Sequence, residues 1–192
     1  IGQGLNEMVH WTFSSTEDVN RALLAPSCQS MVTLQNPLSE NQATLRSSLA
    51  PQLLATTATN THHGNTDVMA FELGPVYKPL DNSELPDQRT SLAVVLSGTN
   101  TQKHWSREEQ PFDFYDIKGI AEAVLDFFHV TAAFEPCDLG LLTQCRAASV
   151  VLDATPVGFL GEVSFPVRAA YGLNQPAYIL ELDLQDLLER PL

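Results

Sequence analysis

The chain has 192 residues and a formal net charge of −13, because 23 acidic residues outweigh 10 basic ones. The basic residues are scattered and no two are adjacent, which argues against binding of nucleic acid by this chain alone, since that requires clustered Lys and Arg. No apolar run approaches the roughly 20 residues that a membrane helix needs, so we expect no membrane association. With 44% hydrophobic residues, the chain can build a substantial core.

The three cysteines, Cys28, Cys137 and Cys145, are odd in number and irregularly spaced. They predict neither a disulfide framework nor a cysteine-based zinc site, because no C-x-x-C pair is present. Reduced thiols indicate a cytoplasmic protein. The sequence starts at Ile1 rather than at methionine, so we expect a fragment excised from a longer chain.

The N-terminal segment predicts a strand followed by a short helix. Apolar and polar residues alternate over 7–13, which places Val9 and Trp11 on the same face of a half-buried strand. Ser15 with Asp18 three residues later predicts a capping box at the start of the helix.

The next segment predicts a short strand, a long polar turn and a helix. Pro37 ends the strand at 31–34, because proline lacks a backbone donor and restricts the residue before it. Ser48 as cap and Pro51 in the first turn predict a helix over 50–61.

The rest of the chain predicts strands in groups rather than in strict alternation with helices. Strands are expected at 68–73, 91–97, 149–152, 157–163 and 178–182, and helices at 116–130 and 184–188. The residues at 153–156 have the composition of a hairpin turn. We therefore expect one α+β domain over 1–192, with a mostly antiparallel sheet of about six strands flanked by helices.

Three separated segments resemble the beta subunit of bacterial phenylalanine–tRNA ligase. They are Asn36-Pro37-Leu38-Ser39-Glu40 with Leu45-Arg46-Ser47-Ser48-Leu49-Ala50-Pro51 behind it, Phe71-Glu72-Leu73-Gly74-Pro75-Val76-Tyr77, and Asp113-Phe114-Tyr115-Asp116-Ile117-Lys118-Gly119 preceded by Trp105. Weaker matches lie at 6–13, 157–163 and 180–184. The segments follow in order along essentially the whole chain. One departure is Thr143-Gln144-Cys145, where the family pattern has a His-Pro-Gly-like turn before Arg146.

The resemblance implies a domain that copies the class II aminoacyl-tRNA synthetase fold without performing catalysis. Its partner would be the alpha subunit, in an assembly of two alpha and two beta chains. The assembled enzyme would use ATP and magnesium and bind tRNA, whereas this chain would hold no cofactor or metal and bind tRNA weakly or not at all.

The sequence can be tested for the catalytic residues that class II synthetases need. An arginine and an acid should follow the second-motif strand, where this chain has Lys78 and Leu80. Lysine cannot reproduce the bidentate fork of arginine, and leucine supplies no acceptor. The third motif needs a glycine-rich strand and an arginine, and 178–188 contains neither glycine nor arginine. The chain alone is therefore predicted to be inactive.

We expect the residues that carry the resemblance to be structural or subunit-facing: Asn36, Pro37, Leu38, Arg46, Glu72, Gly74, Trp105, Phe114, Asp116, Lys118 and Gly119. The aromatic residues among them suit an interface and an ordinary core equally well. Arg46 could bind an anion or tie the turn at 36–41 to the following helix. We expect the tie, because a guanidinium has five donors for turn carbonyls.

Other functions stay open. The main alternative is an independent module that binds a small amino acid-like ligand in the degenerate pocket. A weaker one is a cysteine hydrolase in which Cys145 pairs with His129 or His104. A metal site at His62, His63 and Asp67 is less expected than histidines complementing the end of a helix dipole. For the acids at 108–109 and at 113 and 116, a solvated loop and a helix start are expected rather than a cation site.

Overall fold

The computed structural model describes residues 2–25, 28, 30–80, 85–100, 105 and 108–188. The strands are β1 (Asn6–Glu7), β2 (Phe13–Ser14), β3 (Thr44–Leu45), β4 (Val68–Lys78), β5 (Asp87–Ser97), β6 (Ala133–Pro136), β7 (Leu142–Leu152), β8 (Thr155–Val163) and β9 (Ala177–Asp183). The helices are α1 (Thr16–Arg21), the 3-10 helix η1 (Glu40–Gln42), α3 (Ala50–His62), α4 (Phe114–Phe127), α5 (Phe165–Tyr171) and α6 (Gln185–Leu188).

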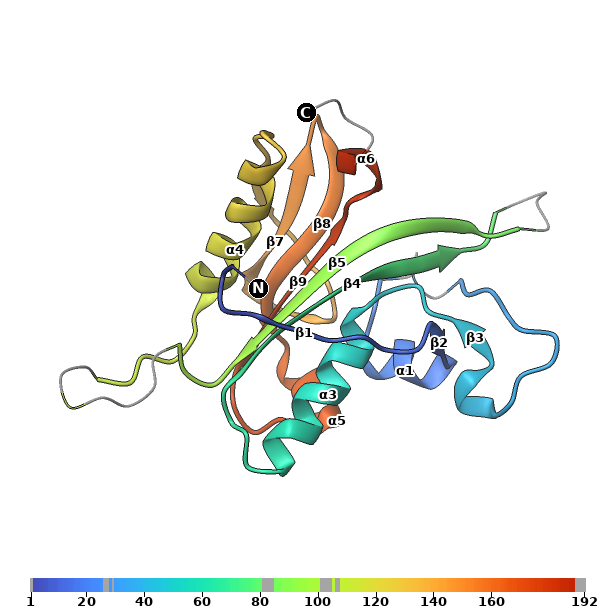
Figure 1. Cartoon of the computed structure of the whole chain (residues 1–192), viewed down its shortest axis with the longest axis horizontal. Coiled ribbons are helices and arrows are strands. Elements are labelled where there is room, and N and C mark those ends of the chain that lie inside the picture. Colours follow the sequence, from blue (N-terminus) through green and yellow to red (C-terminus); the bar gives the residue numbers. More distant parts are fainter. Residues whose placement is uncertain are drawn as a thin grey trace.

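A seven-stranded sheet in the order β1-β4-β5-β9-β8-β7-β6 organises the chain. All neighbouring strands are antiparallel except β1, which pairs with β4 in parallel. The hairpin of β4 and β5 is paired along its whole length, from Val68–Ser97 to Lys78–Asp87, and its far end projects as a curved arm (Figure 1). The predicted α+β class with a mostly antiparallel sheet is confirmed, with one strand more than expected.

Helices cover both faces of this sheet (Figure 1). The α3 side is covered by α1, α3 and α5, which bury leucines such as Leu53 and Leu54 against alternate residues of β4 and β5. The α4 side is covered by α4, whose Ile117, Ala121 and Leu125 pack on the opposite residues of β5, β8 and β9. Each fully buried leucine contributes about 1.5–3 kcal/mol to folding.

Local sequence signals set several helix boundaries. Ser15 and Asp18 form the predicted capping box of α1. In α4 the N-cap is Asp113, which shares a capping box with Asp116, so this helix begins two residues earlier than predicted. In α3 the N-cap is Leu49 rather than the predicted Ser48. The first amides of α3 are bonded mainly by the carboxylate of Glu181 from β9, to which the Ser48 hydroxyl also donates.

Two strand predictions in the N-terminal quarter were wrong. The segment 7–13 is not one half-buried strand, because only its ends pair, and Val9 and Trp11 are 86% and 76% exposed. Between them, His10 bonds to the buried carboxylate of Glu72, while Met8 N still donates to the carbonyl of Phe71 on β4 at 2.7 Å. At 31–34 only Thr33 makes a bridge, to Thr44. Among the described residues, no helix combines the length and the apolar character needed to cross a membrane.

Candidate functional site

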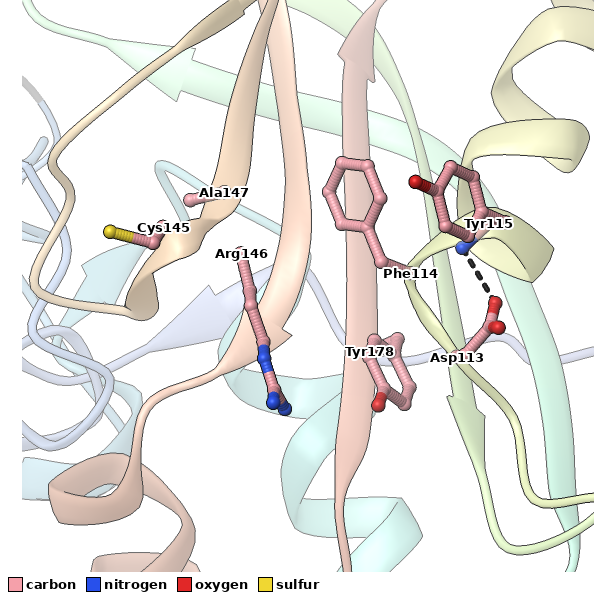
Figure 2. Close-up of a pocket in the computed structure, with 7 residues that line it drawn as sticks. All are labelled: Asp113, Phe114, Tyr115, Cys145, Arg146, Ala147 and Tyr178. Carbon is pink, nitrogen blue, oxygen red and sulfur yellow. Dashed lines mark hydrogen bonds between the residues drawn. The ribbon is translucent and has the colours of Figure 1, made fainter.

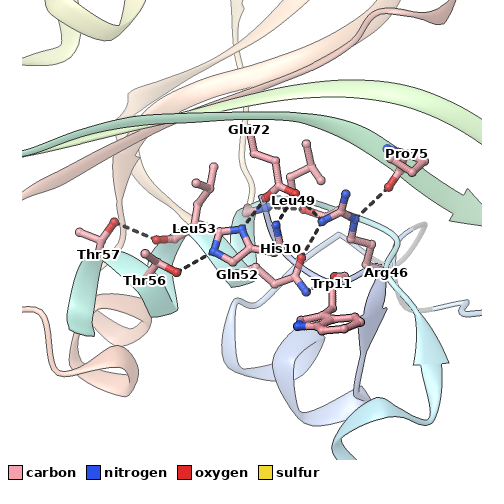
Figure 3. Close-up of polar contacts among 12 residues, drawn as sticks. His10, Trp11, Arg46, Leu49, Gln52, Leu53, Thr56, Thr57, Glu72 and Pro75 are labelled. Atoms are coloured by element: carbon pink, nitrogen blue, oxygen red, sulfur yellow. Dashed lines mark hydrogen bonds and ion pairs between the residues drawn. The ribbon is translucent and has the colours of Figure 1, made fainter. Parts of the chain in front are cut away.

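A buried ion pair lies where β4 meets the start of α3 (Figure 3). The guanidinium Nη1 of Arg46 is 2.7 Å from Oε1 of Glu72, and each side chain is only 2% exposed. Because both charges are out of water, each needs the other and further hydrogen bonds to offset its loss of hydration.

Arg46 makes further hydrogen bonds to β4 and to α3. Nε donates to the carbonyl of Pro75 at 2.9 Å, and Nη1 also donates to Oε1 of Gln52 on α3 at 2.9 Å. Its backbone N–H donates to the carbonyl of Thr12, and its own carbonyl accepts from Tyr77 N, both at 2.9 Å. Arg46 therefore joins the N-terminal segment, β4 and α3.

Arg46 joins separate elements through hydrogen bonds, as predicted, but it does not bond to the turn at 36–41 that was predicted as its partner. None of its hydrogen bonds among the described residues goes to the turn at 36–41, where Leu38 is 91% exposed. A buried guanidinium is satisfied best by a carboxylate, and the turn carbonyls lie outside. The anion that Arg46 binds is the chain's own Glu72.

His10 completes the coordination of Glu72. Its Nδ1 lies 2.6 Å from Oε2 of Glu72, its backbone N–H donates to Oε1 at 3.2 Å, and its Nε2 lies 2.7 Å from the hydroxyl of Thr56 on α3 (Figure 3). Gln52 then donates to the carbonyl of Trp11 at 2.7 Å. The backbone at residues 10–12 is thereby fixed to α3 and β4, while the side chain of Trp11 stays exposed.

Gly74 is required by this arrangement. It lies on β4 between Glu72 and Val76, on the sheet face that Arg46 crosses. A Cβ on Gly74 would lie closer to Nη2 of Arg46 than van der Waals contact allows. The Glu72-Leu73-Gly74-Pro75 segment therefore supplies the carboxylate, the space and the carbonyl that the guanidinium needs.

The environment of Glu72 changes its proton affinity. Burial alone would raise its pKa, but the hydrogen bonds from His10 and Arg46, with the positive charge of Arg46, outweigh burial and hold the pKa below its ordinary value. Glu72 is thus ionised in the folded chain.

A second carboxylate, Glu181 of β9, fills the N-terminus of α3. Its Oε2 accepts from the Ser48 hydroxyl at 2.6 Å and from Ala50 N at 3.3 Å, and its Oε1 accepts from Leu49 N at 3.1 Å. Burial raises the pKa of Glu181, and these hydrogen bonds partly offset that effect. The positive end of a helix is a ready anion site, and here the chain occupies it with its own side chain.

Beyond Glu181 the α3 side of the sheet opens into a cavity of about 270 Å³. Its walls include Lys78 of β4, Ser91 of β5 and Asp183 of β9. Nε of Arg89 lies 2.5 Å from Oδ2 of Asp183, so this carboxylate is already paired. In the described part of the chain, no arginine fork faces this cavity to clamp a phosphate.

A larger concavity of about 450 Å³ lies at the start of α4, facing a bulge in β7 (Figure 2). It is lined by Asp113, Phe114, Tyr115, Cys145, Arg146, Ala147 and Tyr178. Nη1 of Arg146 lies 2.5 Å from Oε2 of Glu162, and Asp113 accepts hydrogen bonds from the backbone of α4. Its charged groups are thus paired or engaged in capping.

The other residues that carry the resemblance lie apart from the Arg46–Glu72 pair. Trp105 is 93% exposed, and Phe114 is half-buried against the core on the α4 side. On α4, Asp116 takes part in the capping box, Lys118 pairs with Glu122, and Gly119 is exposed. Asn36 and Pro37 are exposed, as is Leu38. A subunit-facing role for these residues stays a prediction.

The structure gives no support to a metal or nucleophile site in the part it describes. No group of three or more His, Cys, Asp or Glu residues there could hold a metal ion. His63 caps α3 and Asp67 accepts from Thr99, so these two are used locally. Cys145 makes no hydrogen bond to His129 among the described residues, and His104 lies outside them.

Comparison with solved structures identifies the architecture. The chain superimposes on two pyrrolysyl-tRNA synthetase structures from Desulfitobacterium hafniense with TM-scores of 0.68 and 0.70, at 16% sequence identity. The alignments cover 97% of this chain and 63% and 61% of those chains. The fold is therefore that of a class II aminoacyl-tRNA synthetase core.

Sequence comparison gives the family. Residues 1–184 match the model of the phenylalanyl tRNA synthetase beta chain CLM domain. The phenylalanine–tRNA ligase beta subunits of Geobacter sulfurreducens and Syntrophotalea carbinolica are each 34% identical over 192 residues, which cover 98% of this chain and 24% of those proteins. The chain belongs to the phenylalanine–tRNA ligase beta subunit family and spans about a quarter of the length of these relatives.

Replacement of Gly74 by alanine should destabilise the fold, because the new methyl group displaces the guanidinium of Arg46. We expect Gly74→Ala to lower the free energy of unfolding by about 1–3 kcal/mol, as overpacking does. The matched control is Gly119→Ala, which meets nothing within 4 Å on α4 and should gain about 0.5–1 kcal/mol. Equal effects of both substitutions in urea denaturation would contradict the role of Gly74.

The lowered pKa of Glu72 predicts a pH-dependent contribution to stability. The unfolded chain binds the proton more tightly at this residue, so the stabilisation is complete above the ordinary value of 4.5 and is lost as the pH falls through the lower native pKa. Glu72→Gln should cost about 3 kcal/mol at pH 7, and the difference from wild type should shrink below pH 4.5. A difference that stays constant with pH would exclude this linkage, and Glu40→Gln controls for the removal of one exposed carboxylate.

Removal of the Glu181 carboxylate should leave an empty anion site at the start of α3. We expect Glu181→Ala to lose about 2–4 kcal/mol of stability, because Leu49 N and the Ser48 hydroxyl lose their acceptor in the core. Sodium formate should restore part of this loss relative to sodium chloride at equal ionic strength, while the wild-type chain shows no such difference. Identical responses of both proteins in urea denaturation would show that the site is not recreated.

Proposed function

We propose that this chain is a non-catalytic structural domain of a phenylalanine–tRNA ligase beta subunit. It supports the alpha subunit in an assembly of two alpha and two beta chains, which uses ATP and magnesium to charge tRNA with phenylalanine. Membership of the beta subunit family supports the placement of this chain in such an enzyme. The domain contributes no catalytic residue, binds no cofactor of its own, and contacts tRNA weakly or not at all.

The observation that carries the non-catalytic role is the internal use of polar side chains on the α3 side of the sheet. Arg46 is paired with Glu72, and the amides at the start of α3 bind the carboxylate of Glu181. The residue at the end of β4, where a class II synthetase would clamp a phosphate, is Lys78, which lacks the planar fork of arginine. In the described part of the chain, these groups are engaged in the fold and are not arranged as a site for phosphate chemistry.

Exposed aromatic side chains on fixed backbone support a role in subunit contact. Trp11 is 76% exposed although its carbonyl is held by Gln52, and Tyr115 is 75% exposed on the capped first turn of α4. Tryptophan and tyrosine are enriched in protein interfaces and among the residues that dominate their energetics. A rigid anchor loses little conformational entropy on binding.

The proposal predicts that aromatic anchors of this domain contribute to subunit affinity. In the full-length beta chain, Trp11→Ala, Trp105→Ala and Tyr115→Ala are each titrated with the alpha subunit and followed by sedimentation velocity. We expect at least one to weaken association by about tenfold or more, as truncation of an interface hot spot does. The turnover rate per assembled enzyme should stay unchanged.

The matched control is Glu17→Gln, an exposed polar change on α1 that should leave association unchanged. Wild-type affinity in all three aromatic variants would overturn the interface role of these surfaces. A lower turnover rate in fully assembled enzyme would instead indicate that the domain takes part in catalysis.

A further inference from the structure

The cavity on the α3 side of the sheet keeps hydrogen-bond donors that the fold does not use. Ser91 is only 3% exposed and lines the cavity, yet its hydroxyl has no hydrogen-bond partner among the described residues. Lys78 lines the same cavity and forms no ion pair or hydrogen bond in the described part of the chain. Among the described residues, only the Tyr171 hydroxyl is a fully buried polar side-chain atom without a partner. The Ser91 hydroxyl is therefore accessible from the cavity, where it can bond to a ligand that supplies an acceptor.

The acceptors on the cavity wall are, by contrast, already occupied. The carboxylate of Asp183 receives Nε of Arg89 at 2.5 Å and the backbone N–H of Gln185 at 3.1 Å. The carboxylate of Glu181 receives the hydrogen bonds at the start of α3. The ammonium group of Lys78 can only donate, and the hydroxyl of Ser91 can donate as well, so a ligand whose polar end is an anionic acceptor matches both.

The remaining walls select the body of the ligand. Val76 and Val157 are buried apolar residues that line the cavity together with Phe159 and Leu139. The volume of about 270 Å³ lies at the lower end of small-molecule sites. A molecule with a short apolar body and one anionic head group matches both the walls and the size.

We propose that this cavity is a binding site for a small carboxylate with an apolar body. The carboxylate lies between the ammonium group of Lys78 and the hydroxyl of Ser91, and the body lies against Val76, Val157 and Phe159. A phosphate ion shares the acceptor oxygens but gains nothing from the apolar walls. The site is independent of subunit association, so its failure in the test below would leave the proposed structural role intact.

The test uses the full-length beta chain assembled with the alpha subunit, with propionate, phenylacetate and inorganic phosphate as probes. Saturation-transfer NMR reports binding of each probe. The signal that is lost in Lys78→Met is assigned to this cavity, and the signal that remains is assigned to other sites. We expect both carboxylates to bind, and Lys78→Met to weaken them about tenfold or more, the usual effect of losing a charged hydrogen bond. Ser91→Ala should weaken them severalfold.

Two controls keep the variants interpretable. Lys118→Met removes an ammonium group from α4, on the opposite face of the sheet, and should leave carboxylate binding unchanged. Ser91→Ala should leave the urea midpoint of the ligand-free protein unchanged, because the hydroxyl is accessible from the cavity and makes no hydrogen bond within the described part of the chain. A lowered midpoint would assign Ser91 a structural role and count against the site.

Two further results would overturn the proposal. One is the absence of transfer to either carboxylate, or transfer that persists equally in Lys78→Met and Ser91→Ala. The other is binding of phosphate as tight as that of phenylacetate, which would reduce the site to a general anion contact.

Discussion

The fold depends on one buried ion pair, between Arg46 and Glu72. An isolated charge in the core would be strongly unfavourable, and breaking such a pair typically costs about 3–5 kcal/mol. The surrounding sequence supplies what the pair needs: His10 on the second carboxylate oxygen, Gln52 and the Pro75 carbonyl on the guanidinium, and the space left by Gly74. The N-terminal segment, β4 and α3 can therefore pack only in this arrangement.

Glu181, on the far side of β5, is likewise a buried carboxylate that the fold supplies with donors. It is tolerated in the largely apolar strand β9 because three donors at the start of α3 bind it. The start of α3 is a helix terminus that could bind an anion, and here the chain's own side chain occupies it. The polar groups on this face thus have structural partners, which is compatible with the proposed non-catalytic role.

Much of the fold could be predicted from local signals. Caps at Ser15 and Asp113, the apolar repeat of α4 and the hairpin at 153–156 depend on neighbouring residues, so the sequence displays them directly. The Arg46–Glu72 contact could not be placed, because it joins residues 26 positions apart and depends on the register of β4 against α3. The strand predicted at 7–13 failed because its alternation reflects polar anchoring by His10, with Val9 and Trp11 left outside. Glu181 was the most visible missed signal, as a lone acid between buried leucines.

The central claim is that this domain retains a synthetase fold without synthetase chemistry. The most direct test is amino acid-dependent exchange of labelled pyrophosphate into ATP, measured on an assembly whose alpha subunit has been inactivated in its own ATP site. We predict exchange at the background level, and no change on Lys78→Met in the beta chain. Phenylalanine-dependent exchange above background that disappears with Lys78→Met would contradict the claim.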